Sequence, residues 1–88
     1  MERKTTILIV DDQEDFSFGL CRLIESRFSD FRCLPAVSGA QALDILEKEI
    51  IALMIADLRM PEMNGLQLME KALEIEPTVS VVLLTGYG

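Results

Sequence analysis

Short runs of apolar residues alternate along the chain with segments whose apolar residues recur every three or four positions. Residues 6–10 (TILIV) form an uninterrupted apolar run rich in β-branched side chains, which predicts a strand buried on both faces. From residue 14 to residue 28 the spacing becomes helical. The side chains expected on the inward stripe of this helix are Phe16, Leu20, Leu23, Ile24 and Phe28.

Residues 31–37 (FRCLPAV) predict a second, weaker strand. Pro35 has no backbone N–H to donate to a neighbouring strand, so this strand is expected at an edge of the sheet. Ser38 and Gln41 have the spacing of a capping box and predict the start of a second helix. The inward residues expected on that helix are Ala42, Leu43 and Leu46.

The second half of the chain repeats this alternation. Residues 51–56 (IALMIA) predict a third strand that ends at Asp57, and residues 79–84 (VSVVLL) predict a fourth. Between them, Asn64 is a suitable N-cap for a third helix, and Pro77 follows the end of that helix. The apolar residues expected to carry this helix are Leu66, Met69 and Leu73. Strands alternating with helices predict an α/β domain whose parallel sheet has helices on both faces.

Polar residues stand where three of the predicted strands end: Asp11 and Asp12, then Asp57, then Thr85. Ligands of open parallel sheets bind beyond the carboxyl ends of the strands, so these side chains are expected to converge. Two carboxylates about 4 Å apart repel each other by roughly 4 kcal/mol at an effective dielectric constant near 20. A hard cation such as Mg²⁺ removes that repulsion. An aspartate can also accept a phosphoryl group, whose oxygens a hydroxyl can then contact.

Composition limits the partners. The chain has 88 residues, enough for one small domain, and a formal net charge of −7. This charge argues against nucleic acid or an anionic membrane as a direct partner, and it fits a cation or a basic protein surface. Cys21 and Cys33 have neither disulfide-framework nor metal spacing, which predicts buried thiols of a cytoplasmic protein. No segment is long enough to cross a membrane.

Three stretches together resemble the receiver domain of two-component response regulators: ILIVDDQED at residues 7–15, ADLRMPEMNG at 56–65 and VVLLTGYG at 81–88. The resemblance implies a flavodoxin-like sheet with strand order 2-1-3-4. It implies Asp57 as the phosphoacceptor and Thr85 as the switch hydroxyl. It also implies Mg²⁺ held by Asp11, Asp12, Asp57 and the backbone carbonyl of Arg59. The expected partners are a sensor histidine kinase and an output domain. The sequences DLRMP and LTGYG look most like those of receivers of transcriptional activators that carry a central ATPase module.

The sequence departs from the family in one respect. Family members continue after the fourth strand with a helix, a fifth strand that carries a phosphoryl-contacting lysine, and a final helix. No lysine of this chain can be assigned that role, so we expect residues 1–88 to be the N-terminal part of a receiver domain. On its own, this part is expected to react slowly or not at all with phosphoryl donors. An uncharged fourth strand left at the edge also predicts a homodimer or other self-association.

Two other classes of function are open on the sequence. A phosphatase of the haloacid dehalogenase type uses two aspartates separated by one residue, whereas Asp11 and Asp12 are adjacent. A pseudo-receiver would act only through protein interaction and never take phosphate. The leading interpretation is a phosphoacceptor module that is not an enzyme acting on separate substrates.

Overall fold

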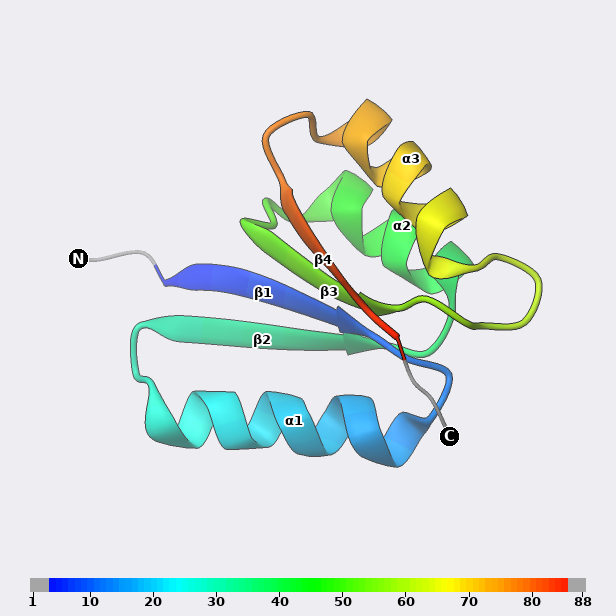
Figure 1. Cartoon of the computed structure of the whole chain (residues 1–88). Helices are drawn as coiled ribbons and strands as arrows, with labels where there is room; N and C mark the ends of the chain where they lie inside the picture. The colour runs from blue at the N-terminus through cyan, green and yellow to red at the C-terminus, as the bar shows by residue number, and fades with distance from the viewer. Residues whose placement is uncertain (1–3, 86–88) are drawn as a thin grey trace.

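A computed structural model describes residues 4–85 and confirms the predicted alternation of strands and helices (Figure 1). Residues 86–88, the end of the third family-like stretch, lie outside the described residues. The elements are β1 (Thr5–Val10), α1 (Glu14–Arg27), β2 (Phe31–Ala36), α2 (Gly39–Lys48), β3 (Leu53–Asp57), α3 (Gly65–Ile75) and β4 (Ser80–Leu84).

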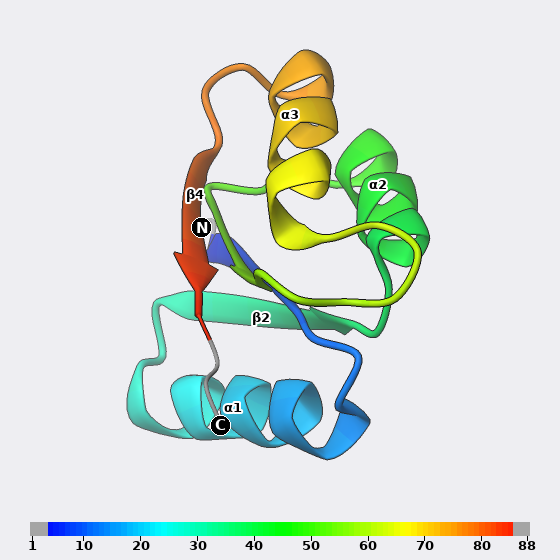
Figure 2. The same cartoon turned by 45° about the vertical axis from the view of Figure 1, so that its right-hand side comes forward.

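The sheet has four parallel strands in the order β2-β1-β3-β4, as the family resemblance implied. Ile7 of β1 stands opposite Cys33 of β2 and Leu53 of β3, and Leu53 in turn stands opposite Ser80 of β4, so β1 and β3 are the interior strands. Helix α1 covers one face of the sheet and helices α2 and α3 cover the other, as Figures 1 and 2 show from two directions. The predicted α/β sandwich is therefore confirmed.

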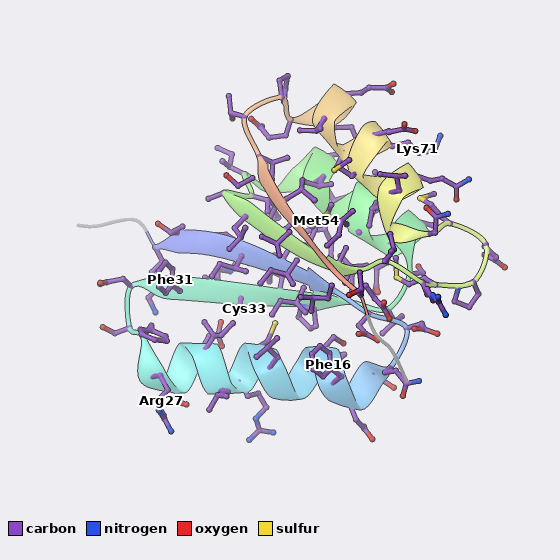
Figure 3. All side chains as sticks on the ribbon, in the orientation of Figure 1. Phe16, Arg27, Phe31, Cys33, Met54 and Lys71 are labelled. Atoms are coloured by element: carbon purple, nitrogen blue, oxygen red, sulfur yellow. The ribbon has the colours of Figure 1, made fainter. Side chains whose placement is uncertain are left out.

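The strand β1 is buried on both faces. Leu8 and Val10 belong to the larger core, which lies between the sheet and helices α2 and α3 and includes Met54. Ile7 and Ile9 belong to the smaller core toward α1. Figure 3 shows Cys33 pointing from β2 toward α1, while Lys71 points away from the sheet. Burial on both faces explains why the first strand reads as a continuous apolar run.

Helix α1 differs from the sequence prediction in the face that it buries. Ser17 and Cys21 are the buried residues of this helix, whereas Phe16, Leu23 and Phe28 are about half exposed. Leu20 and Ile24 of the predicted stripe do pack against the core. Small side chains let the helix approach the sheet closely, and the Ser17 hydroxyl donates to the Glu14 carbonyl, 3.2 Å away, which satisfies it in the buried position.

Helix α3 shows a similar difference. Leu68 and Ala72 are fully buried, while Leu66 and Leu73 are exposed; Met69 lies between these extremes. The inward positions expected for α2, by contrast, are confirmed: Ala42 and Leu46 are buried and Leu43 packs against the same core.

The helix starts follow the predicted caps with one correction. The Ser38 hydroxyl accepts a hydrogen bond from the Gln41 N–H at 3.1 Å, but the Gln41 side chain accepts from the N–H of Val37 instead of Ser38. The pair is therefore not a reciprocal capping box. A complete box occurs at α3, where Asn64 and Gln67 each accept from the other's backbone N–H. The sequence analysis identified only the cap of that pair.

Cys21 and Cys33 are free and buried, as predicted, and they lie in the smaller core between α1 and β2. Burial raises the pKa of both thiols, and their neighbour Glu25 raises them further. Thiols held protonated in this way are poor nucleophiles. Among residues 4–85, no helix combines the length and apolar character that a membrane span requires.

Candidate functional site

The three aspartates singled out in the sequence meet at the carboxyl edge of the sheet. Asp11 follows β1, Asp12 is next to it, and Asp57 is the last residue of β3. Because β1 and β3 are neighbouring parallel strands, their ends lie side by side. Each aspartate offers a carboxylate oxygen, and these oxygens all lie within 4.8 Å of one another. The structure confirms the predicted convergence for the three aspartates.

Two of the three carboxylates are oriented in the same way, by a hydrogen bond from the backbone N–H two residues ahead. Asp11 Oδ1 accepts a hydrogen bond from the Gln13 N–H at 2.7 Å, and Asp57 Oδ1 accepts from the Arg59 N–H at 3.1 Å. An aspartate that bonds the backbone two residues ahead turns the chain out of its strand. In each case one oxygen fixes the side chain and the other is left for a ligand. The sequence analysis did not anticipate these backbone anchors.

The loop after Asp57 is held by a tight turn and a close helix start. The Met63 N–H donates to the Pro61 carbonyl at 2.7 Å, around Glu62 at φ 69°. The Gly65 N–H donates to the Leu58 carbonyl at 2.9 Å. A Cβ at Gly65 would lie 2.6 Å from the carbonyl oxygen of Asp57, so only glycine lets α3 begin this close to the aspartate. The conformation at Glu62 gave no signal in the sequence.

Thr85 and Arg59 are connected to Asp57 through the backbone: Arg59 follows it by two residues, and Thr85 follows the residue paired with it in the sheet. Leu84 is paired with Asp57 in the sheet, and Thr85 follows it directly as an exposed residue. The Leu58 N–H donates to the Leu84 carbonyl at 2.9 Å, which ties the segment after β3 to the end of β4. Arg59 is exposed, and the predicted role of its backbone carbonyl stays a prediction.

The environment of Asp11 raises the pKa of its carboxyl. Its side chain is buried, and burial is the largest cause that raises the pKa of this carboxyl above the usual 3.8. The hydrogen bond from Gln13 opposes that shift, whereas the nearby Asp57 and Asp12 add to it. Asp12 is exposed and Asp57 half-buried, so the cluster is open to ligands from solvent.

The acidic cluster fits a hard divalent cation. Three carboxylates from two adjacent strand ends offer oxygen donors, which Mg²⁺ and Ca²⁺ prefer, and the open side leaves room for coordinated water. Histidine and cysteine are missing from the cluster, which makes zinc a poor match.

The raised pKa of Asp11 predicts that Asp11→Asn stabilises the metal-free chain near neutral pH. A carboxyl with a raised folded-state pKa stabilises the fold while protonated, and this stability is lost as pH rises from 3.8 through the folded-state pKa. The asparagine cannot ionise, and its amide oxygen can still accept from Gln13. Urea unfolding in EDTA across pH 3 to 8 tests this. The free energy of unfolding should be the same for the variant and the parent at pH 3, and it should become increasingly larger for the variant as the pH rises. A variant less stable than the parent at pH 7 would contradict it.

Comparison with known proteins gives a consistent result. Residues 7–88 match the family described as "Response regulator receiver domain". The chain is 37% identical over 84 residues to the transcriptional regulatory protein GlrR of Escherichia coli, covering 93% of this chain and 18% of that protein. It is 34% identical over 84 residues to sporulation initiation phosphotransferase F of Bacillus subtilis, covering 93% of this chain and 64% of that protein. The chain thus spans less than two thirds of the length of either relative.

The fold is also similar to that of a solved response regulator from Burkholderia pseudomallei, described with a phosphorylated aspartic acid, a calcium ion and citrate. The TM-score is 0.85 at 27% identity, and the match covers 97% of this chain and 49% of that one.

Proposed function

The chain belongs to the response regulator receiver domain family, and from this premise we propose that it takes a phosphoryl group from a sensor histidine kinase onto Asp57. The observation that supports this most directly is the convergence of Asp11, Asp12 and Asp57 at the carboxyl edge of the sheet. The family consists of signalling receivers rather than classical enzymes. The proposed output is control of transcription through a further domain, as the name of the Escherichia coli relative suggests.

Asp57 is the proposed nucleophile because its position combines access with fixed orientation. It is half-buried, and Arg59 N–H holds one of its oxygens. The free oxygen would attack the phosphorus of a phosphohistidine. A new P–O bond forms, the P–N bond breaks, and the imidazole leaves with the electron pair and takes up a proton. The product is an aspartyl phosphate.

The proposed roles of the other residues follow from their places around Asp57. Asp11 and Asp12, with Asp57 and the backbone carbonyl of Arg59, would hold Mg²⁺. When bound, the cation supplies positive charge that offsets the charge of the transferring group. Thr85, directly after the residue paired with Asp57, is the proposed switch hydroxyl that contacts the phosphoryl oxygens. Two free, buried thiols fit a reducing compartment, and we propose the cytoplasm as the place of this exchange.

Phosphorylation can be tested with a small phosphoryl donor. Incubated with acetyl phosphate and Mg²⁺, the chain should gain one phosphoryl group by intact mass, and Asp57→Asn should abolish the gain.

A matched control is Asp44→Asn, which removes the same charge from an exposed site paired with Lys48 and should leave labelling unchanged. Labelling that survives Asp57→Asn would refute the assignment of the phosphoacceptor. A parent chain that stays unlabelled after long incubation, though folded and able to bind metal, would favour a pseudo-receiver that acts only through protein interaction.

A further inference from the structure

The loop from Leu58 to Asn64 joins the candidate acceptor Asp57 to helix α3 and is tied down at both of its ends. At its start the Leu58 N–H donates to the Leu84 carbonyl, and at its end the Gly65 N–H donates to the Leu58 carbonyl, both at 2.9 Å. Between these bonds, the N–H groups of residues 59 and 63 donate only to acceptors two residues back in the chain. Such local bonds do not fix the tip of the loop to another element, so side-chain packing has to do so.

Two methionines anchor the tip of this loop. Arg59, Pro61 and Glu62 are exposed, whereas Met60 and Met63 are partly buried and pack against the larger core. An exposed loop held by two apolar side chains depends on each of them for its position.

Met63 lies against Gly39, the buried first residue of α2, and Figure 2 shows the loop beside the start of that helix. A Cβ at Gly39 would be 2.6 Å from Met63 Sδ and 3.1 Å from both Met63 Cβ and Met63 Cγ. The flexible end of Met63 could rotate away from such a Cβ. The Cβ of Met63 is fixed to the backbone, however, so the loop itself would have to shift by a few tenths of an ångström. Glycine at position 39 therefore leaves the space that Met63 fills.

The turn beneath Met63 also supports Asp11. The Asp11 N–H donates to the Ala36 carbonyl at 3.0 Å, three residues before Gly39. Between these two residues, the Ser38 side chain caps the start of α2 and fixes the turn. One end of this short turn thus holds Asp11, and the other end holds Met63.

We propose that Met63, seated on Gly39, is a positioning residue for Asp57. It fixes the loop after β3 to the turn before α2, and so fixes the carboxylate of Asp57 relative to that of Asp11. The inference rests on the proposed function in one respect, that Asp57 is the reacting carboxylate. Met63 acts through the loop, which carries the Arg59 N–H that orients Asp57 and the Arg59 carbonyl proposed as a metal ligand.

Amide hydrogen exchange in EDTA tests this role in the metal-free chain. Gly39→Ala and Met63→Ala disturb the contact from its two sides, so either variant decides the question if the other does not fold. In both, the Arg59 amide should exchange at least about threefold faster than in the parent, since its hydrogen bond to Asp57 is no longer held in line. Arg59 is exposed, so its amide exchanges by local opening, and the rate reports the loop rather than the overall stability.

Metal affinity gives a second measurement. Residues that orient ligands from behind typically change affinity by about 10- to 100-fold, so Mn²⁺ should bind about tenfold more weakly to Gly39→Ala and to Met63→Ala. The double variant should bind no more weakly than the weaker single variant, because both substitutions remove the same contact. Met63→Leu keeps an apolar side chain of similar volume against Gly39 and should retain affinity within about twofold of the parent.

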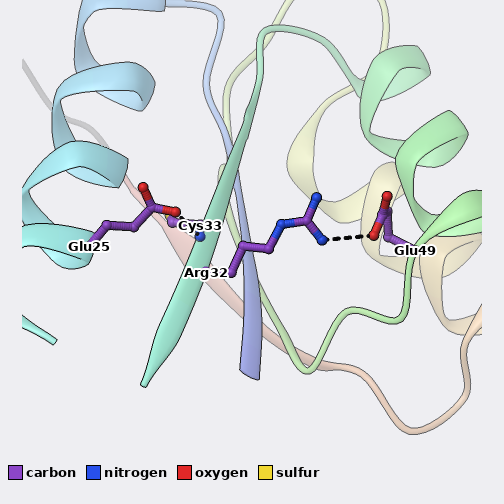
Figure 4. A network of polar contacts seen from close by, with 4 residues as sticks. All are labelled: Glu25, Arg32, Cys33 and Glu49. Atoms are coloured by element: carbon purple, nitrogen blue, oxygen red, sulfur yellow. Dashed lines mark hydrogen bonds and ion pairs between the residues drawn. The ribbon is translucent and has the colours of Figure 1, made fainter. Parts of the chain in front are cut away.

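A matched control loosens α2 at its other end. There Glu49 Oε1 pairs with Arg32 Nη1 of β2 at 3.0 Å (Figure 4). Glu49→Gln removes this ion pair and leaves Met63 on Gly39. The exchange rate of the Arg59 amide and the affinity for Mn²⁺ should therefore stay those of the parent.

The outcomes separate this inference from the proposed function. If Asp12→Asn weakens Mn²⁺ binding while Gly39→Ala and Met63→Ala bind as the parent does, the cation site stands and Met63 is not a positioning residue. Unchanged Arg59 exchange in both variants would overturn the inference even if both are less stable. If the parent takes neither Mn²⁺ nor a phosphoryl group, but Arg59 exchange rises in both variants, the proposed function fails and the positioning role of Met63 stands.

Discussion

Replacing Gly65 by alanine is expected to destabilise the fold by about 1 to 3 kcal/mol, the usual cost of overpacking. The added Cβ would lie 2.6 Å from the Asp57 carbonyl oxygen and 2.9 Å from Leu58 Cα. Both are backbone atoms, so no side-chain rotation relieves the contact. The start of α3 must move away, which lengthens the 2.9 Å hydrogen bond from Gly65 N–H to the Leu58 carbonyl. Urea unfolding measures the loss, and metal affinity should fall with it because Asp57 shifts.

Gly19→Ala is the matched control. Gly19 lies in the exposed middle of α1, and a Cβ there meets no atom within 4 Å. Alanine is a better helix former than glycine by roughly 0.5 to 1 kcal/mol. The same substitution should therefore stabilise the protein at residue 19 and destabilise it at residue 65. If Gly65→Ala is as stable as the parent, the close approach of α3 to Asp57 is not a constraint on the site.

The sequence predicted the order of elements well because strand and helix spacing dominate local structure. It was less successful in choosing the buried face of a helix, which depends on what the helix packs against. In α1 the large residues suggested a stripe through Phe16 and Leu23, yet Ser17 and Cys21 face the sheet. A helix that lies close to a sheet buries small residues at its centre and places large ones at its flanks, and spacing alone cannot show which set is central.

The sequence predicted the positions of the site residues better than it predicted the buried faces of the helices, and the reason is the topology of the sheet. Parallel strands place their carboxyl ends at one edge, so Asp11, Asp12 and Asp57 were expected to meet, and they do. The parts that the sequence did not show depend on exact backbone geometry. These are the amides of Gln13 and Arg59 that orient two carboxylates, and the positive φ of Glu62 that shapes the loop after Asp57.

The second large effect concerns the cation. Titrated with Mn²⁺ or Mg²⁺, the folded chain should be stabilised, because an ion that binds only the folded state shifts the unfolding equilibrium. Asp12→Asn is the most informative variant, since Asp12 is exposed and its carboxylate belongs to the cluster. Removing one of three negative oxygen donors should weaken Mn²⁺ binding at least about tenfold, which corresponds to about 1.4 kcal/mol.

The decisive feature is a reversal of stability order. In EDTA, Asp12→Asn should be more stable than the parent, because it relieves repulsion among carboxylates whose oxygens lie within 4.8 Å of one another. In saturating Mn²⁺ the parent should be the more stable, because it alone keeps all three donors. Asp15→Asn removes the same charge from the first turn of α1, outside the cluster, and should show no such reversal. Thermal unfolding of the three proteins with and without Mn²⁺ gives the answer. If Asp12→Asn has the same rank in both conditions, the cluster is a set of repelling surface carboxylates and not a cation site.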